Sequence, residues 1–135
     1  MTFGWKGKYA EIDLTKKSVS IKNLPRKLMK QYLGSRGINS KMLYDRLEQD
    51  IDPLAPENPL IFGVGPLTGT LTPGSGRWTV TAKSPLTGIL GDSNAGGHWG
   101  PELKFAGFDH LIITGKAEKP VYLLIEDGKI EIKDA

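Results

Sequence analysis

The chain has 135 residues, of which 39% are hydrophobic and 24% charged, a composition typical of one globular domain. Its formal net charge of +3 is modest and its basic residues are interleaved with acidic ones, which does not favour nucleic acid as a partner. The absence of cysteine excludes disulfides and thiolate-held zinc or iron–sulfur sites within this chain.

The first half of the chain shows strand and helix patterns in turn. Residues 8–22 contain two runs in which apolar and polar residues alternate, which predicts a β-hairpin with one buried face. A proline at the first helical position and apolar residues at helical spacing predict a helix over 25–33, and a second helix is predicted over 38–47. Three prolines within 52–59 exclude regular structure there, and the apolar run 60–64 predicts a buried strand.

The centre of the chain is rich in glycine and contains one tetrapeptide twice. Pro-Leu-Thr-Gly occurs at 66–69 and again at 85–88, and turn-rich clusters follow at 73–76 and 91–97. Residues 77–83, between the copies, have the composition of a strand. Most of the chain's 17 glycines lie in this centre. Because glycine lets a backbone approach another body closely, we interpret the segment as backbone laid against a ligand or another part of a protein.

The C-terminal part shows strand patterns after one short helical turn, which is predicted at 103–107. Strands are predicted at 110–114, 121–125 and 130–132, with a tight turn between the last two. Two helices therefore lie between early and late strands, without regular βαβ alternation. This order predicts an α+β fold with largely antiparallel sheets.

Common catalytic and membrane signatures are missing from the sequence. Gly91 and Gly96 have the outer spacing of a phosphate-binding loop, but the lysine that should follow is absent, and no G-x-G-x-x-G occurs. Ser75 does not lie in a G-x-S-x-G context, so a serine hydrolase is not favoured. No apolar run could cross a membrane, and the N-terminus lacks a secretory pattern. We expect a cytoplasmic protein with no membrane partner.

Two features of the glycine-rich centre are candidates for ligand binding. Arg77 is the first charge after a long uncharged run and heads a strand, where its guanidinium could grip an anion or form a surface ion pair. The run Asn94-Ala95-Gly96-Gly97 could offer bare backbone to a ligand or form a long turn. The residues alone leave both alternatives open at both sites.

Two further polar residues have a favoured structural interpretation. His98 could line a pocket, but a packing role beside Trp99 is favoured over it. Glu102 follows a proline at the start of the short helical turn, where its charge would favour the helix N-terminus. Capping is therefore favoured over a catalytic role, and no residue of the chain is predicted to be catalytic.

Read together, these residues resemble the N-terminal domain of the aldehyde ferredoxin oxidoreductase family, the tungsten or molybdenum bis-pterin enzymes. The resemblance covers the whole chain and rests on an ordered set of motifs. They are Gly4-Trp5-x-Gly7-Lys8, Leu33-Gly34-Ser35-Arg36-Gly37, Asp52-Pro53-Leu54-x-Pro56-Glu57-Asn58, Gly65-Pro66-Leu67-Thr68-Gly69-Thr70, Lys83-Ser84-Pro85-Leu86-Thr87-Gly88, Ser93-Asn94-x-Gly96-Gly97, Gly100 to Asp109, and Gly115 to Tyr122.

The resemblance implies a domain on which two metallopterins lie, with their dithiolenes holding one tungsten or molybdenum. It implies that Arg77 contacts the pterin and lies on the route to a 4Fe-4S cluster. It also implies that Asn94, Ala95, Gly96 and Gly97 bind the cofactor through the main chain, and that the Asn94 carbonyl faces a magnesium ion bridging the pterin phosphates. The repeated Pro-Leu-Thr-Gly would then frame both loops.

The parent enzyme implied by the resemblance oxidises aldehydes to carboxylic acids and passes electrons to ferredoxin. Residues 1–135 would be the first part of the family's pseudo-symmetric N-terminal domain, incomplete at its C-terminal end. The cluster would be held elsewhere in the complete enzyme, so we expect this chain to be inactive alone. Its partners would be the remainder of the enzyme or a second copy of itself. The alternative is a non-catalytic remnant, or an assembly or binding module of the same family.

Overall fold

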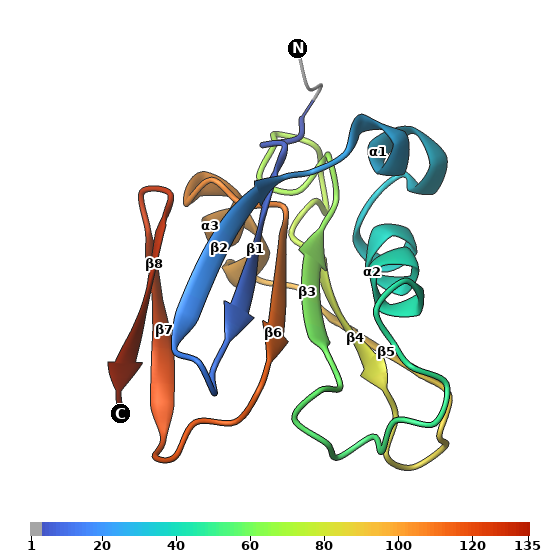
Figure 1. Cartoon of the computed structure of the whole chain (residues 1–135). Helices are drawn as coiled ribbons and strands as arrows, with labels where there is room; N and C mark the ends of the chain where they lie inside the picture. Colours follow the sequence, from blue (N-terminus) through green and yellow to red (C-terminus); the bar gives the residue numbers. More distant parts are fainter. Residues whose placement is uncertain (1–3) are drawn as a thin grey trace.

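The computed structural model describes residues 4–135 and contains one six-stranded sheet, one two-stranded sheet and three helices (Figure 1). The elements are β1 (Lys8–Asp13), β2 (Ser18–Asn23), α1 (Arg26–Tyr32), α2 (Ser35–Tyr44), β3 (Leu60–Val64), β4 (Trp78–Lys83), β5 (Leu90–Ala95), α3 (Trp99–Phe105), β6 (His110–Thr114), β7 (Val121–Glu126) and β8 (Lys129–Asp134).

The large sheet has the strand order β2-β1-β6-β3-β4-β5, and β7 pairs with β8 in a separate hairpin. Its neighbouring strands are antiparallel except for β1 and β6, which run parallel in the register Ile12 to Ile113. The predicted α+β fold with a largely antiparallel sheet is therefore confirmed. The parallel pair joins the first strand to β6, which comes late in the sequence, while the last two strands lie in the separate hairpin.

The large sheet is covered on both faces, and its core has two parts. One cluster lies under α1 and α2 and includes Ile38, Ile61 and Ile112, all at most 2% exposed. The other includes Leu111 and Phe108, and alternate apolar side chains of β7 and β8 pack against it. Leu111 and Ile112 are neighbours in β6 but belong to different clusters, as expected for a strand whose side chains alternate between faces. In Figure 1 the helices α1 and α2 lie to the right of the sheet and the β7–β8 hairpin to the left.

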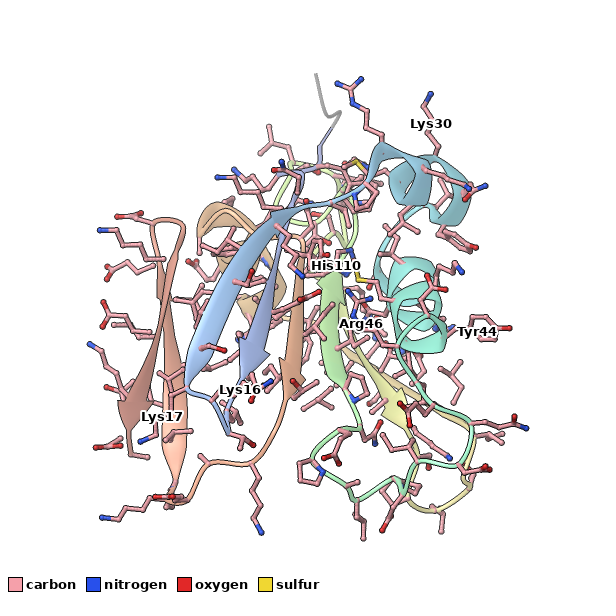
Figure 2. All side chains as sticks on the ribbon, in the orientation of Figure 1. Lys16, Lys17, Lys30, Tyr44, Arg46 and His110 are labelled. Atoms are coloured by element: carbon pink, nitrogen blue, oxygen red, sulfur yellow. The ribbon has the colours of Figure 1, made fainter. Side chains whose placement is uncertain are left out.

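A buried histidine lies in the middle of the molecule. Figure 2 shows His110 at the centre, whereas Lys16, Lys17 and Tyr44 point outward. The Nδ1 atom of His110 lies 2.8 Å from the side-chain oxygen of Asn39, whose amide nitrogen donates to strands β3 and β4. Because that oxygen can only accept, Nδ1 carries the proton. Burial lowers the pKa of His110 to about 3, so the ring is neutral at pH 7.

The second helix begins and ends three residues earlier than the predicted range 38–47. Its start is set by the connection from α1, where Leu33, Gly34 and Ser35 all have positive φ, at 54°, 128° and 35°. The Ser35 hydroxyl then lies within hydrogen-bond distance of the Gly63 carbonyl oxygen and the Thr79 hydroxyl, at 3.1 and 2.7 Å. These tertiary bonds anchor the first turn of α2, and helical spacing in the sequence does not reveal them.

The glycine-rich centre contains a strand that its composition did not predict. The cluster 91–97 was predicted to be turn-rich, but residues 90–95 form β5, which pairs with β4 from Lys83–Leu90 to Trp78–Ala95. An edge strand exposed to solvent needs no apolar alternation, since its backbone ladder alone fixes it. The helical turn predicted at 103–107 overlaps the end of α3, which starts earlier, at Trp99, and ends at Phe105. Among residues 4–135 no helix has the length and apolar character needed to span a membrane.

Candidate functional site

A cleft of about 690 Å³ opens at the end of the sheet where β3 ends and β4 begins. Its walls come from three regions of the sequence: residues 33–36, residues 65–79 and Asn94. They contribute Leu33 with the first residues of α2, the first Pro-Leu-Thr-Gly turn, the loop 72–75, and the adjoining ends of β4 and β5 with Arg77 and Asn94. The volume is typical of a site for a small organic molecule or cofactor.

Arg77 and Asn94 meet at this cleft. Arg77 directly precedes β4, and Asn94 lies one residue from the end of β5, so antiparallel pairing brings them to the same edge. The guanidinium Nη1 of Arg77 donates to the side-chain oxygen of Asn94. The structure thus brings together the two residues that the sequence nominated separately.

Two arginines reach the same face of β5, but only one is neutralised. Asp92 and Asn94 lie two residues apart on that strand and share a face. Arg36 forms an ion pair with Asp92, with both Nε and Nη2 lying 2.8 Å from the same carboxylate oxygen. Arg77 binds a neutral amide instead, and in the described part of the chain it makes no ion pair. The charge of Arg77 is therefore available to an anion in the cleft.

Several glycines close to Arg77 and Asn94 in the sequence leave the backbone open. Gly74 lines the cleft, whereas Gly96 and Gly97 follow Asn94 and are not among the residues that line it. A Cβ atom added at Gly74, Gly96 or Gly97 would meet nothing within 4 Å, so these three positions open onto free space. Ala95, which completes the predicted set, lies exposed at the end of β5. By contrast, a Cβ at Gly76 would lie 2.7 Å from the Gly97 carbonyl oxygen. The absence of a side chain at Gly76 therefore lets this residue approach Gly97. Gly74, Gly96 and Gly97 instead leave free space for a ligand.

The structure separates the remaining candidates from the cleft. His98 is exposed just before α3 and does not line the cleft, so its predicted packing role is not seen. The packing is done by Trp99, whose ring lies 4.5 Å from Trp78 and 5.4 Å from Phe62 between ring centroids. Glu102 lies in the first turn of α3 and is exposed, but no side-chain bond caps that helix.

Comparison with known sequences decides the family. The sequence profile described as "Aldehyde ferredoxin oxidoreductase, N-terminal domain" matches residues 9–135. The chain belongs to this family. The tungsten-containing aldehyde ferredoxin oxidoreductase of Pyrococcus furiosus is 46% identical over 133 residues, which cover 98% of this chain and 22% of that protein. The homologue from Pyrococcus abyssi is 47% identical over the same share of each chain.

Relatives that are named for other activities match the same region. The WOR-like subunit of an aliphatic sulfonate oxidoreductase from Pyrococcus furiosus is 38% identical over 136 residues, again 98% of this chain and 22% of that protein. The solved active-site complex BamBC of benzoyl coenzyme A reductase superposes with a TM-score of 0.96 at 42% identity, over 98% of this chain and 20% of that chain. The chain thus spans about a fifth of the length of these relatives.

In this aldehyde ferredoxin oxidoreductase domain, the first Pro-Leu-Thr-Gly turn belongs to the cleft and the second does not. Thr68 in the first copy is 5% exposed and lines the cleft, whereas Thr87 in the second copy is exposed. The second copy lies in the β4–β5 connection, at the end of those strands opposite Arg77. Only the first copy therefore adjoins the cleft, and the second lies away from the residues proposed to bind the cofactor.

Sequence reasoning missed a buried ion pair behind the first turn. Lys104 of α3 lies 2.8 Å from Asp109, and the two side chains are 5% and 0% exposed. Burial lowers the pKa of Lys104, and the Asp109 carboxylate offsets part of that effect. Asp109 also accepts hydrogen bonds from the backbone of Lys6 and Gly7, at 3.1 and 2.6 Å. Lys104 and Asp109 both lie in the Gly100–Asp109 motif, but no sequence spacing shows that they are buried.

Proposed function

We propose that this chain is the tungstopterin-binding part of an oxidoreductase. Arg77 and the main chain of Asn94, Ala95, Gly96 and Gly97 are the proposed contacts. The observation that carries the proposal is the Arg77 guanidinium, which lies at the cleft on a neutral amide partner and beside open glycine backbone. The family relationship supports it, because relatives of this family are named as tungsten-containing enzymes.

The residues present fit a phosphorylated, polar heterocycle. Phosphate oxygens need positive charge and N–H donors. The cleft offers one uncompensated guanidinium and the bare backbone of Gly74, and the open backbone of Gly96 and Gly97 follows Asn94 at its edge in the sequence. A bulky side chain at those positions would fill the space that the ligand needs. The bound metallopterin supplies the two-electron redox chemistry, and this chain's residues bind and orient it.

The proposal gives the metals no side-chain ligand from this chain. Tungsten or molybdenum would be held by the dithiolenes of the pterins. The main-chain carbonyl of Asn94 is the proposed contact for a magnesium ion, which takes oxygen ligands and commonly binds through phosphates. The Asn94 side chain is already engaged by Arg77, so it would hold the guanidinium while the carbonyl serves the cation.

The parent reaction is proposed to be oxidation of an aldehyde to a carboxylic acid in the cytoplasm, with ferredoxin as electron acceptor. The chain has no cysteine, so a 4Fe-4S cluster would be bound by other parts of the enzyme. Relatives named for aldehyde, sulfonate and coenzyme A substrates share this region at 38–47% identity. That similarity supports a role in the shared cofactor chemistry and not in the choice of substrate.

The alternative is a non-catalytic binding or assembly module that works with other chains or with a second copy of itself. The absence of cysteine favours it, because electrons could not leave through a cluster held by this chain. The purified 135-residue chain should then fail to reduce a viologen dye when an aldehyde is added. Aldehyde-dependent dye reduction by the chain alone would contradict this expectation.

Gly96→Val tests the cofactor site most cleanly. Position 96 has no positive φ and a Cβ there meets nothing within 4 Å, so the substitution should leave folding intact. A branched side chain would intrude on the ligand, so tungsten and pterin content per folded protein should fall. Ser93→Val is the matched control, because Ser93 is exposed in β5 on the face opposite Asn94. Full cofactor content in Gly96→Val would refute the proposed site.

A further inference from the structure

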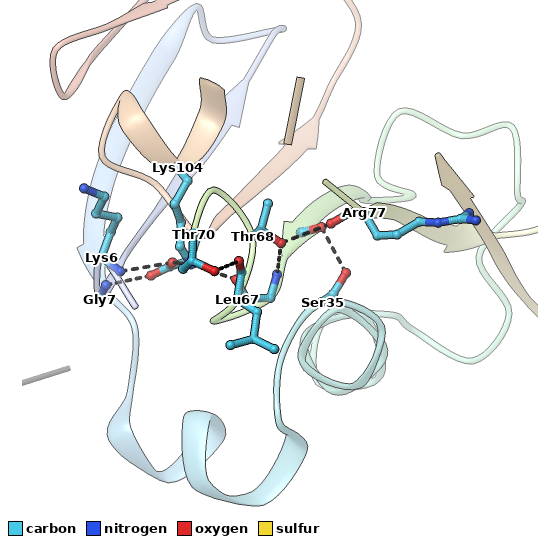
Figure 3. Close-up of polar contacts among 11 residues, drawn as sticks. Lys6, Gly7, Ser35, Leu67, Thr68, Thr70, Arg77 and Lys104 are labelled. Carbon is cyan, nitrogen blue, oxygen red and sulfur yellow. Dashed lines mark hydrogen bonds and ion pairs between the residues drawn. The ribbon is translucent and has the colours of Figure 1, made fainter. Parts of the chain in front are cut away.

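The hydroxyl of Thr68 links the first Pro-Leu-Thr-Gly turn to the backbone of Arg77. Its Oγ1 accepts from the Gly65 amide at 3.2 Å and donates to the Arg77 carbonyl at 3.1 Å (Figure 3). The residue is 5% exposed, so water does not readily replace either bond. One buried atom thus closes the turn and ties it to the residue that we propose as the anion contact.

Arg77 needs the hydrogen bond from Thr68 to fix its backbone, because Arg77 lies outside the hydrogen-bond ladder of β4 and β5. The pairing of β4 with β5 begins at Trp78, one residue later. The preceding segment is a glycine-rich loop, and Arg77 itself is exposed. A loop residue of this kind can sample several backbone conformations unless neighbouring groups fix it. The Thr68 bond fixes the carbonyl of Arg77 and therefore the direction in which its side chain leaves the backbone.

The turn that carries Thr68 is itself fixed by hydrogen bonds to the Gly65 carbonyl. The Lys104 ammonium donates to the Gly65 carbonyl at 2.9 Å and is paired with buried Asp109. The backbone amide of Thr68 also donates to the Gly65 carbonyl, at 3.2 Å. These bonds hold the turn in one conformation. The Thr68–Arg77 bond can fix Arg77 only if the turn that carries Thr68 is itself fixed.

We propose that Thr68 is a positioning residue for Arg77, and that it sets the affinity of the cleft for phosphate-type anions without binding them. This inference rests on the proposed function of Arg77. A hydroxyl is required because one atom must accept a hydrogen bond and donate another. Serine keeps both bonds, whereas valine keeps the shape and loses both.

Binding of inorganic pyrophosphate, followed by NMR titration of the chain, tests the proposal. Thr68→Val should bind at least about tenfold more weakly, because a displaced guanidinium loses a charge-assisted contact. Thr68→Ser should bind within about twofold of the unsubstituted chain. Thr70→Val is the matched control, because its hydroxyl bonds the Leu67 carbonyl in the same loop but is exposed. Equal affinity of Thr68→Val and the unsubstituted chain would overturn the proposal.

A double-mutant cycle with Arg77→Ala separates positioning from direct contact. If Thr68 acts through Arg77, Thr68→Val should cost no further affinity in the Arg77→Ala background. Additive losses would mean that Thr68 touches the anion itself and would overturn the proposal. Unchanged binding in Arg77→Ala would overturn both this inference and the proposed function. Loss in Arg77→Ala but not in Thr68→Val would remove this inference alone.

A measurement on the unsubstituted chain covers the case in which Thr68→Val does not fold. The Thr68 hydroxyl proton should exchange slowly enough with water to give its own NMR signal, with nuclear Overhauser contacts to Arg77 or Trp78. The exposed Thr70 hydroxyl should give no such signal. A Thr68 hydroxyl that exchanges as fast as that of Thr70 would contradict the proposed tie.

Discussion

The two copies of Pro-Leu-Thr-Gly adopt similar turns in very different surroundings. Gly69 and Gly88, which end the two copies, have φ values of 75° and 71°. A Cβ at Gly69 would lie 3.3 Å from the Phe105 ring, whereas one at Gly88 would meet nothing within 4 Å. The leucines differ as well, since Leu67 is 57% exposed and Leu86 is 93% exposed. Local sequence therefore sets the turn, and the surroundings decide what the turn does.

The first copy is packed because two glycines let other segments approach it. A Cβ at Gly4 would lie 2.4 Å from the Pro66 carbonyl oxygen, and one at Gly34 would lie 3.0 Å from the Pro66 ring. The N-terminal segment and the α1–α2 connection thus close around this turn at the top of Figure 1, while the β4–β5 turn lies at the bottom. We infer that the packed copy is part of the binding apparatus and that the exposed copy only joins two strands.

Removing the cation behind the packed turn should have the largest effect. Lys104→Met leaves the Asp109 carboxylate buried without its cation, which should lower the free energy of unfolding by about 3–5 kcal/mol. The Lys83 ammonium near the exposed turn donates to the carbonyls of Gln49 and Ile51 and has no carboxylate partner among residues 4–135, so Lys83→Met should cost less than about 1.5 kcal/mol. Urea unfolding measures both. The pair Lys104→Met with Asp109→Asn should recover part of the loss, and equal costs for the two lysines would contradict the comparison.

Acid should lower the free energy of unfolding through His110. This residue pairs with Gly63 in the sheet, just before the first Pro-Leu-Thr-Gly turn. Its pKa of about 3 lies below the ordinary value of 6.5, so the unfolded chain binds a proton that the folded chain excludes. Stability is complete above pH 6.5 and falls as the pH drops toward 3, by about 2 kcal/mol at pH 5. Urea unfolding at pH 7 and 5 should show this loss, and His110→Gln should remove it. An unchanged pH dependence in that variant would refute the assignment.

Alanine at the two turn glycines should give the smallest difference. Both substitutions impose positive φ on a residue with a Cβ, which costs about 1 kcal/mol. Gly69→Ala should cost more than Gly88→Ala because its methyl group presses on Phe105 at the packed turn. Thermal unfolding of the two variants makes the comparison. A larger loss in Gly88→Ala would show that the exposed turn is the more constrained one.

Sequence patterns predicted the elements that have a clear apolar pattern. They failed for elements whose secondary structure is set by tertiary contacts. The hairpin at 8–22 follows from apolar alternation, and the strand at 60–64 follows from a continuous apolar run. The exposed strand β5 carries Gly91, Asp92 and Asn94, residues that favour turns, and only its ladder to β4 makes it a strand.

The same limit applies to the candidate site. Arg77 and the run from Asn94 to Gly97 could be nominated from charge and glycine content. The different roles of Thr68 and Thr87 could not, because the two tetrapeptides are identical. Burial by distant segments, and the Lys104–Asp109 pair behind the first copy, are features of the folded chain alone.

The cofactor content of two arginine variants tests the central claim most directly. Arg77→Ala and Arg36→Ala each remove one guanidinium from the same face of β5, but only Arg77 lacks a carboxylate partner. Each variant would be made in the protein that carries this chain, produced with tungstate, and its tungsten and pterin measured per folded molecule. We predict that Arg77→Ala loses most of its cofactor and that Arg36→Ala retains it. Full retention in Arg77→Ala, or a greater loss in Arg36→Ala, would contradict the account.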